Sequence, residues 1–150
     1  MTIIIWDHKN KLLGADRKAV QSEMARRVTK IRRIRGHLCA AAGDWDLAQE
    51  MFQWFEQGAD PDRVPPCVRN KDDWVAFVVI TPEGRVLKYE RSPLPMDFTE
   101  SAEYDGWYVF GSGRDFAVGA LGAGADIHTA LDVTARFCVS CGMGFDVVSL

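Results

Sequence analysis

Short apolar runs joined by turn-length connections make up much of this 150-residue chain, and they favour mainly antiparallel sheets. Residues 2–6 are apolar and β-branched, residues 7–10 are typical of a turn, and residues 12–15 are again largely apolar. Two strands joined by so short a turn must run antiparallel, since a parallel pair needs a long crossover. We therefore predict a β-hairpin over residues 2–15.

Two further hairpins and three helices follow along the chain. The second hairpin is expected from Arg26–Arg35 and residues 38–42, with Gly36 between them, and the third from Trp74–Ile80 and Arg85–Glu90. Helical spacing of apolar residues predicts helices over 45–57, 114–121 and 127–137, and short strands are predicted at 107–110 and 145–150. Residues 59–73 hold three prolines and are predicted to be a connecting loop.

This order of elements predicts a single α+β domain over residues 1–150. Strands come first, then a helix, more strands, two helices and a last strand, without the alternating helices and strands of a parallel sheet. A four-layer αββα sandwich would accommodate the order, with two mainly antiparallel sheets flanked by helices.

Composition excludes several classes of protein. Hydrophobic residues at 47% and charged residues at 26% are ordinary for a globular domain. The longest apolar run, Trp74–Ile80, is far shorter than the 18 or so residues that a membrane span needs. No secretion signal is recognisable, so we expect a cytoplasmic protein without membrane contact, and we expect no metal or other cofactor.

Four cysteines are best interpreted as free thiols, because disulfide frameworks belong to secreted proteins. Cys138 and Cys141 form a C-x-x-C motif. A zinc ribbon would need a second pair, and a thioredoxin-like pair would precede a helix, whereas this one follows a predicted helix. The sequence leaves the role of this pair open.

A basic run interrupts an otherwise slightly acidic chain of net charge −3, since six of the eleven residues from Arg26 to Gly36 are Lys or Arg. These side chains are expected to be solvated or to face a neighbouring subunit. A nucleic-acid site is the less favoured alternative, because such sites usually add interleaved aromatic residues or a recognition helix.

Thr2 directly follows the initiator methionine, and a residue this small permits removal of Met1. The exposed α-amine would have a pKa of about 7.7 to 8.0, so a useful fraction could accept the proton of the same residue's hydroxyl. One residue would then supply both nucleophile and base.

Five short motifs surround this threonine in an order that resembles the proteasome-like threonine peptidases with an N-terminal nucleophile. The resemblance is to HslV-type enzymes and to short bacterial or phage proteasome homologues, and it spans nearly the whole chain. The motifs are Thr2-Ile3-Ile4-Ile5, Gly14-Ala15-Asp16-Arg17, Val28-Thr29-Lys30-Ile31, Ala42-Gly43-Asp44 and Gly111-Ser112-Gly113.

The resemblance implies the N-terminal-nucleophile hydrolase fold and a set of catalytic roles. Thr2 would attack the peptide carbonyl, Lys30 would lower the pKa of its amine, and Asp16 would anchor Lys30. Ser112 would support the amine as a proton relay, and the backbone N–H of Ala40 would serve as the oxyanion donor. Gly111-Ser112-Gly113 taken alone is typical of a helix N-terminus rather than of a phosphate site.

The resemblance also implies a homo-oligomeric ring that encloses the nucleophile, unfolded polypeptide or peptide substrates, and an AAA+ ATPase unfoldase as partner. The chain departs from the family at Ala40, where a glycine is usual, before Ser140, where an aspartate is missing, and at 59–73, where a second helix is missing. An amide hydrolase of non-peptide substrates and a catalytically silent ring-forming homologue therefore remain as alternatives.

Overall fold

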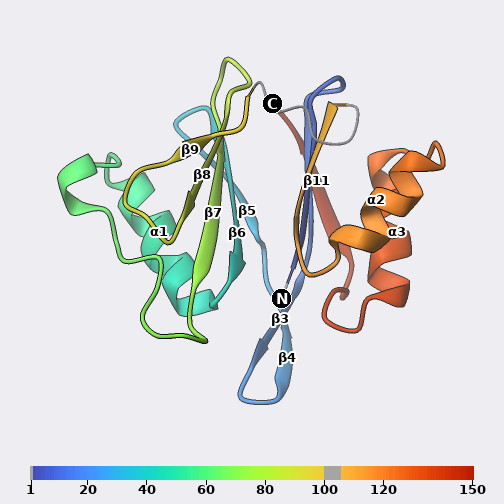
Figure 1. Ribbon diagram of the computed structural model, residues 1–150, viewed down its shortest axis with the longest axis horizontal. Helices are drawn as coiled ribbons and strands as arrows, with labels where there is room; N and C mark the ends of the chain where they lie inside the picture. Colours follow the sequence, from blue (N-terminus) through green and yellow to red (C-terminus); the bar gives the residue numbers. More distant parts are fainter. Residues whose placement is uncertain (1, 100–105) are drawn as a thin grey trace. The chain divides into compact units, whose positions relative to one another are not determined.

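The computed structural model describes residues 2–99 and 106–150 of the chain (Figure 1). These residues form two compact units. The first unit comprises the described residues up to Ile31 and those from 106 onward, and the second extends from Arg32 to residue 99. Each unit has an antiparallel sheet with one or two helices packed on it. The α+β class is confirmed, whereas a single domain over residues 1–150 stays a prediction.

The first unit has a four-stranded antiparallel sheet in the order β10-β1-β2-β11, with two helices on one face (Figure 1). Alternate side chains of β1, Ile3 and Ile5, point to the helices and pack on residues such as Leu131. Helix α3 lies so close to β2 that a Cβ added at Gly14 would be 2.6 Å from Leu131 Cδ1. The elements are β1 (Ile3–Asp7), β2 (Leu12–Asp16), β10 (Trp107–Gly111), α2 (Arg114–Gly122), α3 (Ile127–Phe137) and β11 (Phe145–Ser149).

A separate two-stranded hairpin follows β2 in the first unit. Its strands, β3 (Lys18–Gln21) and β4 (Met24–Arg27), are joined at Ser22 and Glu23, which have positive φ angles of 48° and 66°. Two left-handed central residues are typical of the type I′ turn, which usually holds Asn or Gly. Neither Ser22 nor Glu23 is typical of this turn, so the hairpin was not predicted from the sequence.

The prediction of one strand over Arg26–Arg35 is wrong. Strand β4 ends at Arg27, residues 28–30 are irregular, and β5 (Ile31–Ile34) begins a different sheet. The physical reason is that Lys30 turns into a buried polar site, which a regular amphipathic strand would not permit at that position.

The second unit has a five-stranded antiparallel sheet in the order β5-β6-β7-β8-β9, covered on one face by α1 (Figure 1). Asp44 caps α1, and its Oδ1 accepts a hydrogen bond from Leu47 N at 2.9 Å. The second unit's remaining elements are β6 (His37–Gly43), α1 (Trp45–Glu56), the 3₁₀ helix η1 (Pro61–Arg63), β7 (Val75–Ile80), β8 (Val86–Glu90) and β9 (Met96–Asp97).

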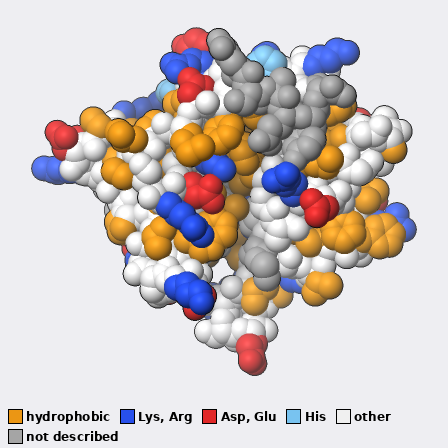
Figure 2. Space-filling view, viewed as in Figure 1, with side chains coloured by type: hydrophobic (Ala, Val, Ile, Leu, Met, Phe, Trp, Pro, Cys, Tyr) orange, Lys and Arg blue, Asp and Glu red, His pale blue; other side chains and the backbone are white. Residues whose placement is uncertain are grey.

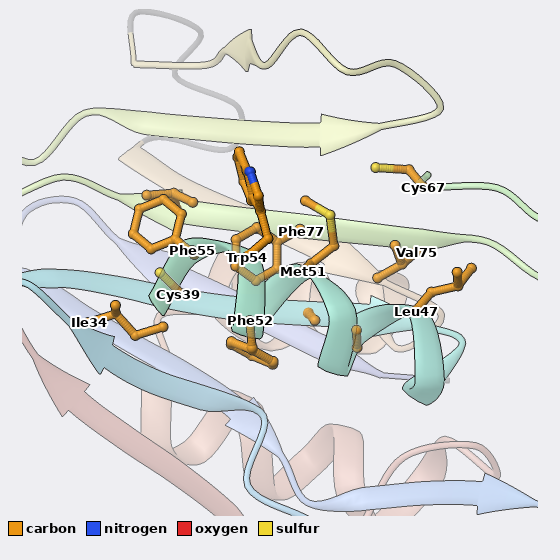
Figure 3. Close-up of a cluster of buried hydrophobic side chains, with 13 residues drawn as sticks. Ile34, Cys39, Leu47, Met51, Phe52, Trp54, Phe55, Cys67, Val75 and Phe77 are labelled. Carbon is orange, nitrogen blue, oxygen red and sulfur yellow. The ribbon is translucent and has the colours of Figure 1, made fainter. Parts of the chain in front are cut away.

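Aromatic side chains fill the space between α1 and its sheet, as Figure 3 shows. Phe52 is fully buried, and its ring centroid lies 5.2 Å from that of Phe77 on β7. Trp54 and Phe55 pack edge to face beside them with centroids 6.0 Å apart. Burial of large rings in this geometry stabilises the second unit mainly through apolar contact.

The other predicted elements are confirmed to within one or two residues at their ends. The first and third hairpins, the three helices, and the strands at 107–110 and 145–150 are all present. Within residues 59–73, the structure adds only the short η1 helix to the predicted loop. The two-residue strand β9 and the β3–β4 hairpin were not predicted. None of the described helices has the length and apolarity that crossing a membrane would require.

Candidate active site

The first unit brings four of the five predicted site residues together. Thr2 immediately precedes β1, Asp16 ends β2, Lys30 lies in the irregular segment before β5, and Ser112 follows β10. Because β1 is hydrogen-bonded to both β2 and β10, the ends of these three strands meet beside Thr2. Met1, whose removal was predicted, lies outside the described residues.

Lys30 and Thr2 make the central contact of the site. Lys30 Nζ donates a hydrogen bond to Thr2 Oγ1 at 2.6 Å and another to Asp16 Oδ1 at 2.9 Å. The exposed fractions are 3% for Thr2, 2% for Lys30 and 1% for Asp16. A buried lysine and carboxylate are rare unless they are paired, so the contact explains how the chain accommodates both.

Asp16 is held from several directions, and this fixes Lys30 in turn. Its Oδ1 also accepts the backbone N–H of Ile3 at 3.1 Å, and its Oδ2 accepts those of Lys18 at 3.2 Å and Gly142 at 3.0 Å. Backbone donors from three separate segments therefore position the carboxylate.

Burial lowers the pKa of Lys30, because the charged ammonium loses its hydration, and the neighbouring Asp16 carboxylate opposes this shift. The lysine can stabilise negative charge on Thr2 Oγ1 while it is protonated. The same geometry would also let a neutral Lys30 accept the hydroxyl proton. The arrangement thus places a cation in direct contact with Thr2 Oγ1.

The Gly111-Ser112-Gly113 segment is pressed against the backbone of Thr2. Gly111 has a φ angle of +102°, and a Cβ added there would lie 2.0 Å from Thr2 O. Gly113 N donates to Thr2 O at 3.4 Å and is the N-cap of α2. The predicted helix N-terminus is confirmed, and the two glycines are explained by this close approach.

The Ser112 hydroxyl contacts the main-chain carbonyl of Thr2 rather than the Thr2 hydroxyl. Ser112 Oγ lies 3.5 Å from Thr2 O and 3.1 Å from Ser140 Oγ. Its side chain also hydrogen-bonds to the buried thiol of Cys141, whose pKa is raised to about 12, chiefly by burial. Ser140 and Cys141 thus border the site, and the sequence did not predict their contacts with Ser112.

Ala40 belongs to the second unit, in the middle of β6. It is fully buried and pairs with Val78 of β7. Its predicted function as an oxyanion donor stays a prediction.

The basic run is divided between the two units. Arg26 and Arg27 are exposed on β4, and Lys30 is buried in the site. Arg32 on β5 donates to Gln49 Oε1 at 2.7 Å and lies over the Phe52 ring. On the face drawn in Figure 2, the Lys and Arg side chains of the described residues stand apart and form no continuous basic surface. Within residues 2–99 and 106–150, no cluster of His, Cys, Asp and Glu could hold a metal ion.

The sequence matches no protein-family profile and none of the curated proteins. Solved structures are nevertheless similar over the whole chain. BPH from Thiobacillus denitrificans, solved in complex with epoxomicin, is 14% identical with a TM-score of 0.69, covering 100% of this chain and 98% of that one. HslV from Trypanosoma brucei is 18% identical with a TM-score of 0.65, covering 97% of each chain.

Anbu from Hyphomicrobium sp. strain MC1, solved as a Gly-1 mutant, is 14% identical with a TM-score of 0.72, covering 100% of this chain and 81% of that chain. At these identities the likeness establishes architecture and leaves activity open. The predicted fold is confirmed: this chain has the proteasome-like, HslV-type N-terminal-nucleophile hydrolase fold.

Proposed function

We propose that this protein is a threonine peptidase whose nucleophile is Thr2, freed as the N-terminal residue by removal of Met1. The observation that carries the proposal is the 2.6 Å contact between Lys30 Nζ and Thr2 Oγ1, buried and anchored by Asp16. A threonine in a merely structural role has no need of a buried ammonium on its hydroxyl, because the desolvation of such a charge is costly.

The proposed reaction follows from these groups. The free α-amine takes the proton of the Thr2 hydroxyl, and Oγ1 attacks the carbonyl carbon of a peptide bond. Lys30 stabilises the developing negative charge on Oγ1, and its own positive charge keeps the α-amine neutral at lower pH. The α-ammonium then protonates the leaving amine, and water hydrolyses the ester that remains. Ala40 N–H is the proposed oxyanion donor and Ser112 the proposed relay.

We further propose a cytoplasmic homo-oligomeric ring that encloses Thr2 and receives unfolded polypeptide or peptides, with an AAA+ ATPase unfoldase as partner. The exposed β3–β4 hairpin supports an assembly, since none of its strand residues is buried within the described chain. A two-stranded ribbon of this kind is marginally stable alone, and a neighbouring subunit would cover it. Light scattering that finds only monomers or dimers at micromolar concentration would contradict the ring.

The test of the nucleophile combines mass measurement with one substitution. The purified protein should lack Met1 and should cleave a fluorogenic peptide, whereas Thr2→Ala should lose activity by at least about 10³-fold while assembling normally. Thr2→Ser should keep part of the activity, because serine supplies the same hydroxyl and amine. Epoxomicin, the compound bound to the Thiobacillus protein, should add to the wild type and not to Thr2→Ala.

Two other outcomes identify the alternatives. Retention of Met1 together with a lack of peptide cleavage would favour a catalytically silent homologue. Met1 removal without peptide cleavage would favour an amide hydrolase of non-peptide substrates. Both alternatives should be tested, because Ala40 stands where the related peptidases usually have a glycine.

A further inference from the structure

The C-x-x-C motif forms a tight turn directly after α3. Cys141 N donates to Cys138 O at 3.2 Å, and the two thiols hydrogen-bond to each other. A β-turn closed in this way holds its end Cα atoms within about 7 Å, which overlaps the separation of about 4.4 to 6.8 Å found in disulfides. The backbone therefore presents the two sulfurs to each other without rearrangement of α3.

The same turn contacts the Thr2 site at three points. The Cys141 thiol hydrogen-bonds to the Ser112 side chain. Cys138 Sγ lies 3.4 Å from Ser140 Oγ, which lies 3.1 Å from Ser112 Oγ. The residue after the turn, Gly142, donates its N–H to Asp16 Oδ2 at 3.0 Å. A chemical change at the two thiols would thus reach both Ser112 and Asp16.

We propose that Cys138 and Cys141 are a modification site, which forms a reversible disulfide by exchange with a small-molecule disulfide of the glutathione class, and that this disulfide lowers activity at Thr2. The first half depends only on the thiols. The second half rests on the proposed peptidase function.

Cys138 is the attacking group. Burial acts to raise the pKa of the Cys138 thiol, but hydrogen bonds from Ser140 and Cys141 outweigh it, so the pKa is lowered. Val139, beside it in the turn, is 90% exposed, so the reagent meets the turn at this residue. The raised pKa of Cys141 makes it the resolving thiol, which loses its proton only as a leaving thiolate takes it.

The exchange balances in two steps. The Cys138 thiolate attacks one sulfur of the small disulfide, breaks its S–S bond and releases one thiolate, which takes up the Cys138 proton. Cys141 then attacks Cys138 Sγ in the mixed disulfide, releases the second thiolate and passes its proton to it. Two cysteines are oxidised, and one small disulfide is reduced to two thiols.

The disulfide alters the site because it changes the sulfur to which Ser112 donates a hydrogen bond. Formation of the S–S bond would draw Cys141 Sγ toward Cys138 and away from Gly113, where an added Cβ would lie 2.9 Å from it in the reduced protein. A disulfide sulfur is also a weak acceptor, so the hydrogen bond from the Ser112 hydroxyl would be lost. Loss of one such hydrogen bond reduces a rate by about three- to tenfold. We expect oxidised protein to be slower by that factor, and dithiothreitol to restore the rate.

Peptide mapping tests the disulfide itself. Reduced full-length protein treated with glutathione disulfide should become lighter by two hydrogen atoms and yield a peptide with Cys138 linked to Cys141. Thr2→Ala should behave identically, so this result does not depend on catalysis. Cys67→Ser, altered in the second unit, should form the same link, and Cys138→Ser should not. A persistent glutathione adduct, or unmodified thiols, would overturn the proposal.

Two measurements test the coupling to Thr2. Oxidation should slow peptide cleavage by the wild type, whereas the rate of Cys138→Ser, whatever its starting value, should not change on treatment with glutathione disulfide. Oxidation should also shift the NMR amide signals of Ile3 and Gly142, which both bond to Asp16, and this holds even if the protein proves not to be a peptidase. Linked protein with an unchanged rate and unchanged amide signals would overturn the coupling and leave the disulfide standing.

Discussion

The two units bury different kinds of side chain, and the difference separates stability from chemistry. The second unit buries an aromatic cluster around Phe52 and Phe77. The first unit also has an apolar core, yet beside it lie the buried charges of Lys30 and Asp16 and the Thr2 hydroxyl. Apolar burial is non-directional and stabilises roughly in proportion to the area removed from water, whereas a buried ion pair stabilises little unless its groups are well positioned. The first unit therefore has a buried ion pair of little stabilising value at this site, which the proposed peptidase function would explain.

We expect the largest loss of stability from a substitution in the aromatic cluster of the second unit. Phe52→Ala should lower the free energy of unfolding by about 3 to 5 kcal/mol, because it leaves a cavity under α1. The activity of each molecule that remains folded should be nearly unchanged, as denaturant melts combined with active-site titration would measure. Phe137→Ala is the matched control, since its ring is 62% exposed, and it should change stability by less than about 0.5 kcal/mol. Equal losses of unfolding free energy in the two variants would show that the buried aromatic cluster contributes no more than an exposed ring.

Lys30→Ala should affect chemistry more than folding. We expect the rate to fall by about 10²- to 10³-fold, because a preorganised charge beside the nucleophile is lost. Without the ammonium, the α-amine of Thr2 stays protonated to higher pH, so the pH–rate profile of the residual activity should shift upward. Lys30→Arg should also be impaired, since its planar guanidinium cannot occupy the same position.

Arg33→Ala is the control for Lys30, because it removes an exposed cation of the same basic run. It should leave the rate within about twofold of the wild type. If Arg33→Ala is crippled and Lys30→Ala is fully active, the assignment of the site is wrong.

Asp16→Asn should destabilise the first unit by about 3 kcal/mol near neutral pH, since it leaves the Lys30 ammonium buried without its countercharge. The cost is limited because the lysine can release its proton. Without Asp16, the pKa of Lys30 in the folded protein should fall further below its ordinary value of 10.5. Between these two pKa values the unfolded protein binds more protons than the folded protein, so the free energy of unfolding rises with pH. The difference from wild type should therefore shrink as the pH rises from neutral toward the ordinary lysine pKa of 10.5.

The thiols of Cys39 and Cys67 lie in the second unit, so their raised pKa values are common to both proteins and cancel in the difference. The Asp16 carboxylate also raises the pKa of Cys141, and loss of that contribution changes the difference in the same direction as Lys30, near and above the ordinary thiol pKa of 9.0. Glu56→Gln is the control in the second unit, where Glu56 pairs with Arg32 at 3.3 Å on the surface. It should cost less than about 1 kcal/mol at any of these pH values. A difference for Asp16→Asn that grows with pH would contradict the assigned direction of the lysine pKa.

The smallest effect is expected at the glycines next to Thr2. Gly111→Ala should cost more than about 2 kcal/mol and reduce activity, because the positive φ and the Thr2 carbonyl both exclude a side chain. Gly119→Ala, in α2 with nothing within 4 Å of an added Cβ, should instead stabilise by about 0.5 to 1 kcal/mol. A neutral Gly111→Ala measured by thermal melts would show that the contact with Thr2 is not required.

Local patterns in the sequence determined most of the secondary structure. The spacing of apolar residues in 45–57 and 127–137, with aspartate caps before them, specified α1 and α3 within a residue or so. The turns near residues 7–10 and 81–84 likewise fixed two hairpins. These features were predictable because a helix face, a cap or a tight turn depends on residues that are neighbours in the chain.

The tertiary structure alone decided which polar residues meet. In the sequence, Lys30 is one of six cations in a basic run, and only long-range pairing buries it against Thr2 and Asp16. Cys141 and Gly142 lie more than a hundred positions after Asp16 in the chain, yet they contact the same site. No local pattern in the sequence predicts that contact. Sequence determines elements through short-range periodicity, whereas a site is made by the register of β1 with β2 and β10, and that register is set by the packing of the whole unit.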